Sequence, residues 1–224
     1  MVKAILFDFD GTLVDASKAI IQTFNSVVTR FGLDPWTHNR ITTGIGKPLV
    51  TLFQEIRPEC RPFQLQEMLK AYEELAGEED PRAVRLKPNV RLTLASLNER
   101  VRMGIVTSRR STGARNILRH FELEQYFSAV IGIENVDRPK PDAEPLRMAL
   151  DLLGVSAEEA LMVGDTPDDV RSARNAGVKS AGVTTGHQAL SDLLAAEPDF
   201  LIHDLSELTE LPELVGNSVG VMEE

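Results

Sequence analysis

The apolar positions of the chain alternate between short runs and helical stripes over most of its length. Residues 2–7 are short, mainly apolar and free of turn residues, which is typical of a buried strand. The next convincing strand is at residues 103–107, and further apolar runs predict strands at residues 129–133, 161–163, 180–184 and 200–202.

Apolar residues at helical spacing separate these runs. A stripe from Ile20 to Phe31 predicts a helix with Asp15 or Ser17 as its N-cap and Gly32 as its stop. Similar stripes predict helices near residues 49–56, 65–75, 88–100, 111–120, 142–153, 167–176 and 188–195. Residues 156–159 match a capping box for a short helical turn, residues 77–81 form an acidic break, and residues 216–224 form a polar tail expected to fray.

The regular alternation from residue 103 onward predicts an α/β fold, a Rossmann-like parallel sheet with helices on both faces. A crossover between parallel strands needs only about a dozen residues, whereas the gap between Gly11 and Arg102 is far longer. Residues 15–86 are therefore expected to form an inserted small α-helical cap domain, and residues 1–14 with 87–224 the α/β core. Hinges are expected near residues 13–15 and 86–88.

Two acids follow the first predicted strand. Asp8 and Asp10 are two residues apart, so both can face one site while Phe9 packs into the core. At ~4 Å and an effective dielectric of ~20, like charges repel by ~4 kcal/mol, so one acid is protonated or a cation lies between them. Mg²⁺ takes carboxylate oxygens together with substrate phosphate. The structural alternative is an acidic turn, since Asp10-Gly11 is also common turn chemistry.

Other polar groups follow later strands, at the edge where open α/β sheets bind ligands. They are Thr107-Ser108, Lys140 between two prolines, and the segment Gly164-Asp165-Thr166-Pro167-Asp168-Asp169. Each has a structural reading by itself: Thr107 can end a strand, Lys140 can be a solvated loop cation, and Asp165 can cap the following helix. Their joint occurrence favours a shared function.

In this order the motifs resemble the four signature elements of the haloacid dehalogenase-like superfamily, in its phosphatase branch. The resemblance covers essentially the whole chain, and the inserted helices resemble the small helical cap of that family. Similarity is greatest to phosphoglycolate-phosphatase-like members, a group that includes pyrophosphatases. The matching segments are residues 8–15, Thr107-Ser108, Lys140-Pro141, and Gly164-Asp165 with Asp169.

The resemblance implies a phosphatase that uses Mg²⁺ and an aspartyl-phosphate intermediate. Asp8 would attack phosphorus, and Asp10 would act first as an acid and then as a base. Asp8, the backbone carbonyl of Asp10, and Asp165 would hold the ion. Thr107, Ser108 and Lys140 would hold the non-bridging phosphate oxygens. Asp169, with Asp168 as a further candidate, would orient Lys140 or metal-bound water without contacting the phosphate.

The leading substrate is a small phosphorylated metabolite resembling phosphoglycolate, because Lys47, Arg109 and Arg110 are placed to hold a carboxylate. Lys47 and Arg109 are therefore the candidate specificity residues. The loop around Trp36 is another candidate for substrate contact, although packing within the cap is favoured for it. His187 follows a strand end, where a surface or helix-start role is favoured.

Several alternatives remain open. An inorganic pyrophosphatase or a sugar phosphomutase would use the same acids, and Gly44-Ile45-Gly46-Lys47 is the nearest match to a mutase phosphate clamp. Asp10 argues against a dehalogenase, because a halide leaving group needs no proton. A phosphonatase would use a cap lysine, but the pattern around Lys47 does not match. Alternatives of another class are a phospho-acceptor receiver domain, which is shorter and lacks a cap, and a non-catalytic binding protein.

The composition and charge of the chain disfavour several classes of binding partner. The 224 residues carry a net charge of −10, which disfavours nucleic acid and anionic membrane surfaces. No apolar run reaches membrane-spanning length, and the first strand begins too early for a signal peptide to be expected. Cys60 is the only cysteine, so no intrachain disulfide is expected and a cytoplasmic location fits. We expect a monomer or homodimer that binds a small phosphorylated metabolite.

Overall fold

The computed structural model describes residues 1–77 and 81–215 and confirms the α/β prediction. A six-stranded parallel sheet has the order β5-β4-β1-β6-β7-β8. Strands β4 and β5 lie on one side of β1, and β6, β7 and β8 lie on the other, so the strand order reverses at β1. Open parallel sheets bind ligands at the carboxyl ends of the strands where the order reverses. The strands are β1 (Ala4–Phe7), β4 (Arg102–Val106), β5 (Ala129–Ile131), β6 (Ala160–Gly164), β7 (Lys179–Val183) and β8 (Phe200–Ile202).

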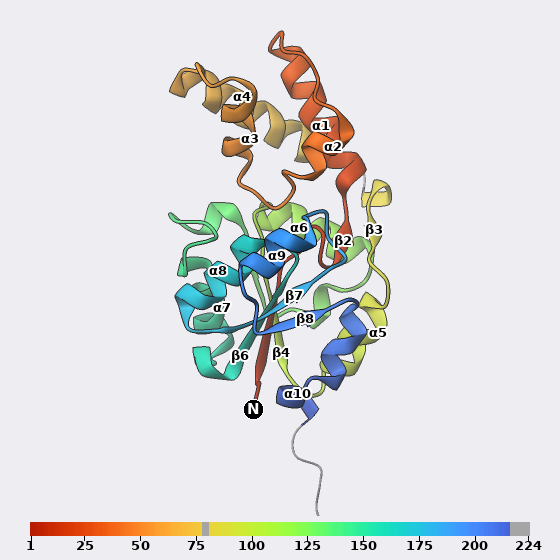
Figure 1. The fold of residues 1–224 in the computed structure, drawn as a ribbon. Helices are drawn as coiled ribbons and strands as arrows, with labels where there is room; N and C mark the ends of the chain where they lie inside the picture. Colours follow the sequence, from red (N-terminus) through yellow and green to blue (C-terminus); the bar gives the residue numbers. More distant parts are fainter. Residues whose placement is uncertain (78–80, 216–224) are drawn as a thin grey trace, which may run out of the picture.

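Helices cover both faces of the sheet (Figure 1). Alternate residues of β1 point to opposite faces, so Ile5 and Phe7 join one apolar cluster while Ala4 and Leu6 join another. The first cluster includes residues of α5 (Val90–Leu97), α6 (Ser111–His120) and η5 (Leu205–Glu210), and the second includes residues of α7 (Glu144–Leu153) and α8 (Pro167–Ala176). Helix α9 (Leu190–Ala195) packs beside α8, and α10 (Pro212–Val215) beside η5.

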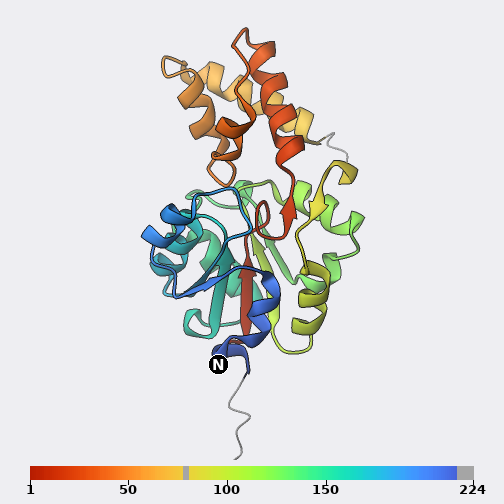
Figure 2. The ribbon, with the colours of Figure 1, turned by 45° about the vertical axis from the view of Figure 1, so that its right-hand side comes forward.

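Four helices stand beyond the carboxyl ends of the strands (Figures 1 and 2). We call α1 (Ser17–Arg30), α2 (His38–Thr42), α3 (Leu49–Ile56) and α4 (Pro62–Gly77) the cap bundle. It has an apolar cluster of its own, in which the rings of Phe24 and Phe53 stack with their centroids 5.2 Å apart. Trp36 packs on Phe24 at 5.3 Å, as favoured from the sequence.

Two short strands connect the cap bundle with the rest of the chain. Strands β2 (Val14–Asp15) and β3 (Arg85–Leu86) pair in an antiparallel manner, and η1 (Pro81–Ala83) precedes β3. They lie where the hinges were predicted, although the domain boundaries at residues 15 and 86 stay a prediction. Asp15 Oδ1 accepts a hydrogen bond of 3.0 Å from the backbone N–H of Ser17, where α1 begins.

Most differences from the sequence prediction concern the ends of elements. The helix predicted at residues 88–100 is α5, which starts after Asn89 because that residue has a φ of 58°. The strand predicted at residues 129–133 ends at Ile131, and η3 (Ile133–Asn135) follows. The turn predicted at residues 156–159 is η4 (Ala157–Glu159), while α2, η2 (Glu124–Tyr126), η5 and α10 were not predicted. Residues 78–80 of the acidic break and the tail 216–224 lie outside the described residues. Within the described part of the chain, no helix has the length and apolar character needed to cross a membrane.

Candidate active site

The predicted polar residues converge at the carboxyl end of β1. Asp8 and Asp10 follow β1, Thr107 follows β4, and Asp165 follows β6. Lys140 comes from the loop before α7 and reaches back to Asp8. All of these side chains are buried, as is that of Asp169 in the first turn of α8. Burial of so many charged groups in one place is costly unless they pair with one another or with an ion.

Lys140 joins two of the acids. Its Nζ donates to Asp8 Oδ1 at 2.7 Å, to Asp169 Oδ1 at 2.5 Å and to the backbone carbonyl of Val106 at 3.1 Å. An ammonium group has three donors, so this lysine is fully satisfied. Burial by itself would lower the pKa of Lys140, but the carboxylates of Asp169 and Asp8 outweigh burial and raise that pKa. The lysine is therefore a fixed positive charge.

The acids outnumber this lysine. Asp8, Asp165 and Asp169 bring one carboxylate oxygen each within 4.8 Å of the others. Burial raises the pKa of Asp8 to about 7 although Lys140 opposes it, and burial with the charges of Asp8 and Asp169 raises the pKa of Asp165. The Oδ2 atom of Asp8 is buried and has no hydrogen-bond partner among the described residues. Excess buried negative charge with a bare carboxylate oxygen fits a hard divalent cation such as Mg²⁺.

The chain wraps closely around Asp165. Thr12 Oγ1 donates to Asp165 Oδ1 at 2.8 Å. A Cβ atom on Gly11, whose φ is +102°, would lie 2.4 Å from Asp165 Oδ2, and one on Gly186 would lie 1.9 Å from the same oxygen. Glycine at both positions therefore leaves room for this carboxylate. Thr12 is not among the predicted site residues, although its place directly after the two acids and a glycine is a usable signal.

Asp169 is held by a capping box. The backbone N–H and Oγ1 of Thr166 donate to Asp169 Oδ2 at 3.0 and 2.7 Å, while the other oxygen accepts from Lys140. The Thr-x-x-Asp spacing is a recognisable sign of such a cap. The N-cap Thr166 therefore positions Asp169, and Asp169 in turn holds Lys140. Asp168 points elsewhere, with its Oδ1 3.3 Å from Arg171, and the structure does not bring it to Lys140.

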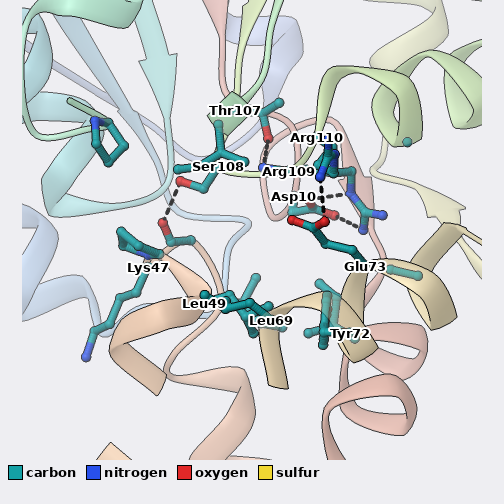
Figure 3. A pocket seen from close by; sticks show the side chains of 18 of the residues that line it. Asp10, Lys47, Leu49, Leu69, Tyr72, Glu73, Thr107, Ser108, Arg109 and Arg110 are labelled. Atoms are coloured by element: carbon teal, nitrogen blue, oxygen red, sulfur yellow. Dashed lines mark hydrogen bonds and ion pairs between the residues drawn. The ribbon is translucent and has the colours of Figure 1, made fainter. Parts of the chain in front are cut away.

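Arg109 holds the second acid of the first motif. Its Nε and Nη2 donate to Asp10 Oδ2 and Oδ1, each at 2.9 Å, which is a bidentate pair (Figure 3). The backbone N–H of Arg109 also donates to Thr107 Oγ1 at 3.1 Å. In this structure the guanidinium group is bound to Asp10, and its predicted contact with substrate stays a prediction.

The other predicted specificity residues also have protein partners. Lys47 Nζ lies 3.9 Å from Glu55, and Figure 3 shows its amine pointing away from Thr107 and Asp10. Arg110 Nη1 lies 2.6 Å from Glu73 Oε2 on α4, which forms an ion pair between the cap bundle and the sheet side of the site.

Further contacts join the cap bundle to the loops of the sheet. Ser108 Oγ donates to the carbonyl of Gly46 at 3.1 Å, and Gln188 Nε2 donates to the carbonyls of Thr43 at 3.0 Å and Ile45 at 3.1 Å. The loop that is the nearest match to a mutase phosphate clamp therefore touches the sheet side through its backbone carbonyls. His187 lies 3.6 Å from Asp15, beside the crossing into α1.

A cavity of about 800 Å³ separates the acids from the cap bundle. Asp8, Asp10 and Thr107 line one end of it, and residues of α3 and α4 line the other. A substrate in this cavity would place its phosphate against Asp8 and its remaining part against the cap bundle.

Known proteins share the sequence pattern and the fold of this chain over most of its length. The family model "Haloacid dehalogenase-like hydrolase" matches residues 5–183. Pyrophosphatase PpaX of Bacillus velezensis is 33% identical over 211 residues, which is 94% of this chain and 96% of the relative. A Bacteroides fragilis protein described as a haloacid dehalogenase-like hydrolase superposes with a TM-score of 0.88 at 32% identity, covering 93% of this chain and 100% of that one. A predicted phosphoglycolate phosphatase from Haemophilus somnus superposes with a TM-score of 0.83 at 25% identity, covering 93% and 97% of the two chains.

Proposed function

The chain belongs to the haloacid dehalogenase-like hydrolase family and is a phosphatase, and from this premise we propose that Asp8 is its nucleophile, with Mg²⁺ as cofactor. The observation that carries the proposal is the state of the Asp8 carboxylate. Lys140 holds one of its oxygens at 2.7 Å, and the other is buried without a hydrogen-bond partner among the described residues. A carboxylate that Lys140 holds in place, with its other oxygen open to a divalent cation and a substrate-sized cavity beside it, suits attack on phosphorus.

The reaction proceeds in two displacements. An oxygen of Asp8 forms a bond to phosphorus while the bond from phosphorus to the leaving oxygen breaks, and Asp10 gives that oxygen a proton. Asp10 then takes a proton from water, which attacks phosphorus, releases inorganic phosphate and restores Asp8. Arg109 acts as a positioning residue, because its two hydrogen bonds fix both oxygens of Asp10.

Two side chains stabilise the phosphoryl oxygens in this proposal, Lys140 through its charge, because protein acceptors already use its three donors, and Thr107 through its hydroxyl. Lys140 lies beside Asp8 with its direction fixed by Asp169, and Thr107 lines the same cavity. A positive charge and a hydroxyl that are already in place stabilise the charge on the transferring group without reorganisation.

The donors present fit a magnesium ion. Asp8, Asp165 and the backbone carbonyl of Asp10 would hold it. Asp169 supports the site without ligating, because both of its oxygens already accept hydrogen bonds from Lys140 and Thr166. When bound, a divalent cation supplies charge neutralisation and polarisation of the phosphoryl group.

Residues 15–86 are proposed to act as a cap that closes over the phosphate. The paired strands β2 and β3 carry both chain crossings, so they are suitable hinges. Closure would exclude water and bring α3 and α4 against the leaving group. A cytoplasmic location and a monomeric or dimeric state stay predictions from the sequence.

A pyrophosphatase is the second candidate, favoured by the 33% identity to pyrophosphatase PpaX over 94% of the chain. Phosphoglycolate remains a candidate through the Haemophilus somnus neighbour. The phosphomutase alternative gains no support from Lys47, whose amine faces Glu55.

The first experiment measures release of inorganic phosphate from p-nitrophenyl phosphate with Mg²⁺. We expect multiple turnovers for the natural chain, which excludes a receiver domain, and none for Asp8→Asn. Asp168→Asn is the matched control, because Asp168 contacts Arg171 and not Lys140, and it should stay within about twofold of the natural rate. Sustained turnover by Asp8→Asn would refute the proposed nucleophile.

A further inference from the structure

The cavity is large for the substrates that the relatives suggest. Its volume of about 800 Å³ lies within the ~300–1,000 Å³ typical of pockets for organic ligands. Phosphoglycolate and pyrophosphate are compact polyanions that would occupy only the end at Asp8 and Thr107. The remaining space faces the cap bundle, so the residues that line it bear on the nature of the leaving group.

The wall facing the phosphate end is apolar. Figure 3 shows Leu49, Leu69 and Tyr72 of the cap bundle across the cavity from Thr107 and Ser108. These three side chains pack against the apolar cluster of the cap bundle but are only partly buried by it, and their remaining surface lines the cavity. Further apolar lining comes from Ile20, Leu52 and Ala76 on the cap side and from Ile117, Ile133 and Val136 on the sheet side.

Three of the basic side chains that line the cavity lie beside carboxylates of the protein. Arg109 forms its bidentate pair with Asp10, Arg110 lies 2.6 Å from Glu73, and Lys47 lies 3.9 Å from Glu55. The exposed Lys70 on α4 is followed by Glu73 and Glu74, which also line the cavity, so this edge is not a positive patch. A second anionic group on the substrate would have to break one of these pairs or approach Lys70 beside the two glutamates.

We propose that the preferred substrate is a phosphomonoester whose alcohol part is an extended apolar group, aliphatic or aromatic. Its phosphate would lie at Asp8, and its apolar part would cover the exposed sides of Leu49, Leu69 and Tyr72. Removal of that apolar surface from water supplies the binding energy. The inference rests on the proposed phosphatase function and specifies its leaving group.

A series of n-alkyl phosphates tests the inference without altering the protein. Ethyl, butyl and hexyl phosphate have nearly the same leaving-group basicity and differ in apolar length. A fully buried CH₂ is worth ~0.8 kcal/mol, or about fourfold, so kcat/KM should rise at least about tenfold from ethyl to hexyl phosphate. It should also exceed the values for phosphoglycolate and pyrophosphate. A flat or falling series, or faster turnover of either polyanion, would overturn the inference while leaving the phosphatase intact.

Substitutions in the apolar wall test whether it causes the dependence of kcat/KM on alkyl length. Leu69→Gln and Leu49→Gln should each lower kcat/KM for hexyl phosphate about tenfold and that for ethyl phosphate by a clearly smaller factor, because ethyl phosphate covers less of the apolar wall. Phe63→Gln is the matched control, since Phe63 lies on the same helix as Leu69, is 58% exposed and does not line the cavity. If the two leucine variants lost kcat/KM equally for ethyl and hexyl phosphate, the proposal that these leucines contact the apolar part of the substrate would be wrong. If no phosphate ester, p-nitrophenyl phosphate included, is turned over, the proposed function itself fails.

Discussion

The guanidinium group of Arg109 donates one hydrogen bond to each carboxylate oxygen of Asp10, both of 2.9 Å. The two residues are 99 positions apart in the chain and come from loops after neighbouring strands. The geometry fixes the orientation of the group that we propose transfers protons in both displacements. Arginine, unlike lysine, holds a carboxylate through two parallel donors.

Replacing Arg109 by lysine should therefore impair catalysis while keeping the charge. A lysine can make only a point contact with Asp10, and misplacement by about 1 Å can cost on the order of 10²-fold in rate. We expect kcat to fall about 10- to 100-fold with a smaller change in KM, measured by steady-state kinetics on p-nitrophenyl phosphate. Arg110→Lys is the neighbouring control, because its exposed ion pair with Glu73 tolerates lysine. Equal losses in the two variants would contradict a positioning role for Arg109.

Replacing Lys140 by methionine should destabilise the metal-free protein. The substitution leaves Asp8 and Asp169 buried without their shared cation. Breaking a buried ion pair from one side typically costs ~3–5 kcal/mol. Urea unfolding in a chelating buffer measures the difference, and adding Asp8→Asn to the same chain should recover part of the loss. A variant as stable as the natural protein would mean that the pairs seen here do not persist in solution.

Stability without metal should depend on pH through Asp8. The pKa of this carboxyl is raised by burial from 3.8 to about 7, so between these pH values the folded state holds a proton that the unfolded state has lost. The free energy of unfolding from this group therefore falls as pH rises, by at most ~1.4 kcal/mol per pH unit. Urea unfolding at pH 5, 6 and 7 should show a smaller decline, or a net rise, in Asp8→Asn relative to the natural chain. Parallel curves for the two proteins would count against the raised pKa.

Gly186→Ala should displace Asp165. The added methyl group would lie 1.9 Å from Asp165 Oδ2, far inside contact distance. We expect kcat/KM to fall on the order of 10²-fold with weaker activation by Mg²⁺, because Asp165 is a proposed ligand. Gly32→Ala is the control: its added methyl group meets nothing within 4 Å, and its φ of +72° costs ~1 kcal/mol of stability without touching the site. Full activity in Gly186→Ala would show that the position of Asp165 is not critical.

Much of the fold followed from periodicity alone. Helices α6 and α8 and strand β8 have the bounds that the apolar pattern predicts. The five-residue α2 carries no apolar stripe long enough to detect. Strands β2 and β3 form by pairing Val14 with Leu86, two residues that the inserted helices separate in the sequence. Short elements defined by distant partners leave little local signal in a sequence.

The candidate site shows the same division. Motif order pointed to Asp8, Lys140, Asp165 and Asp169, whose side chains the structure gathers. Asp169 was the motif match and Asp168 a further candidate, and only Asp169 occupies the capping position that turns its carboxylate inward. The contact of Arg109 with Asp10 and that of Thr12 with Asp165 depend on side-chain directions across 99 and 153 positions of chain, which spacing cannot supply.

The most direct test of the central claim is to trap the phosphorylated enzyme and locate the modified residue. The protein would be mixed with substrate and Mg²⁺, quenched in acid, treated with borohydride to reduce any acyl phosphate, digested and examined by mass spectrometry. We expect the side chain at position 8 to be converted to homoserine, in amounts that depend on substrate. Reduction at any other carboxylate, or steady turnover with no reducible acyl phosphate at Asp8, would contradict it.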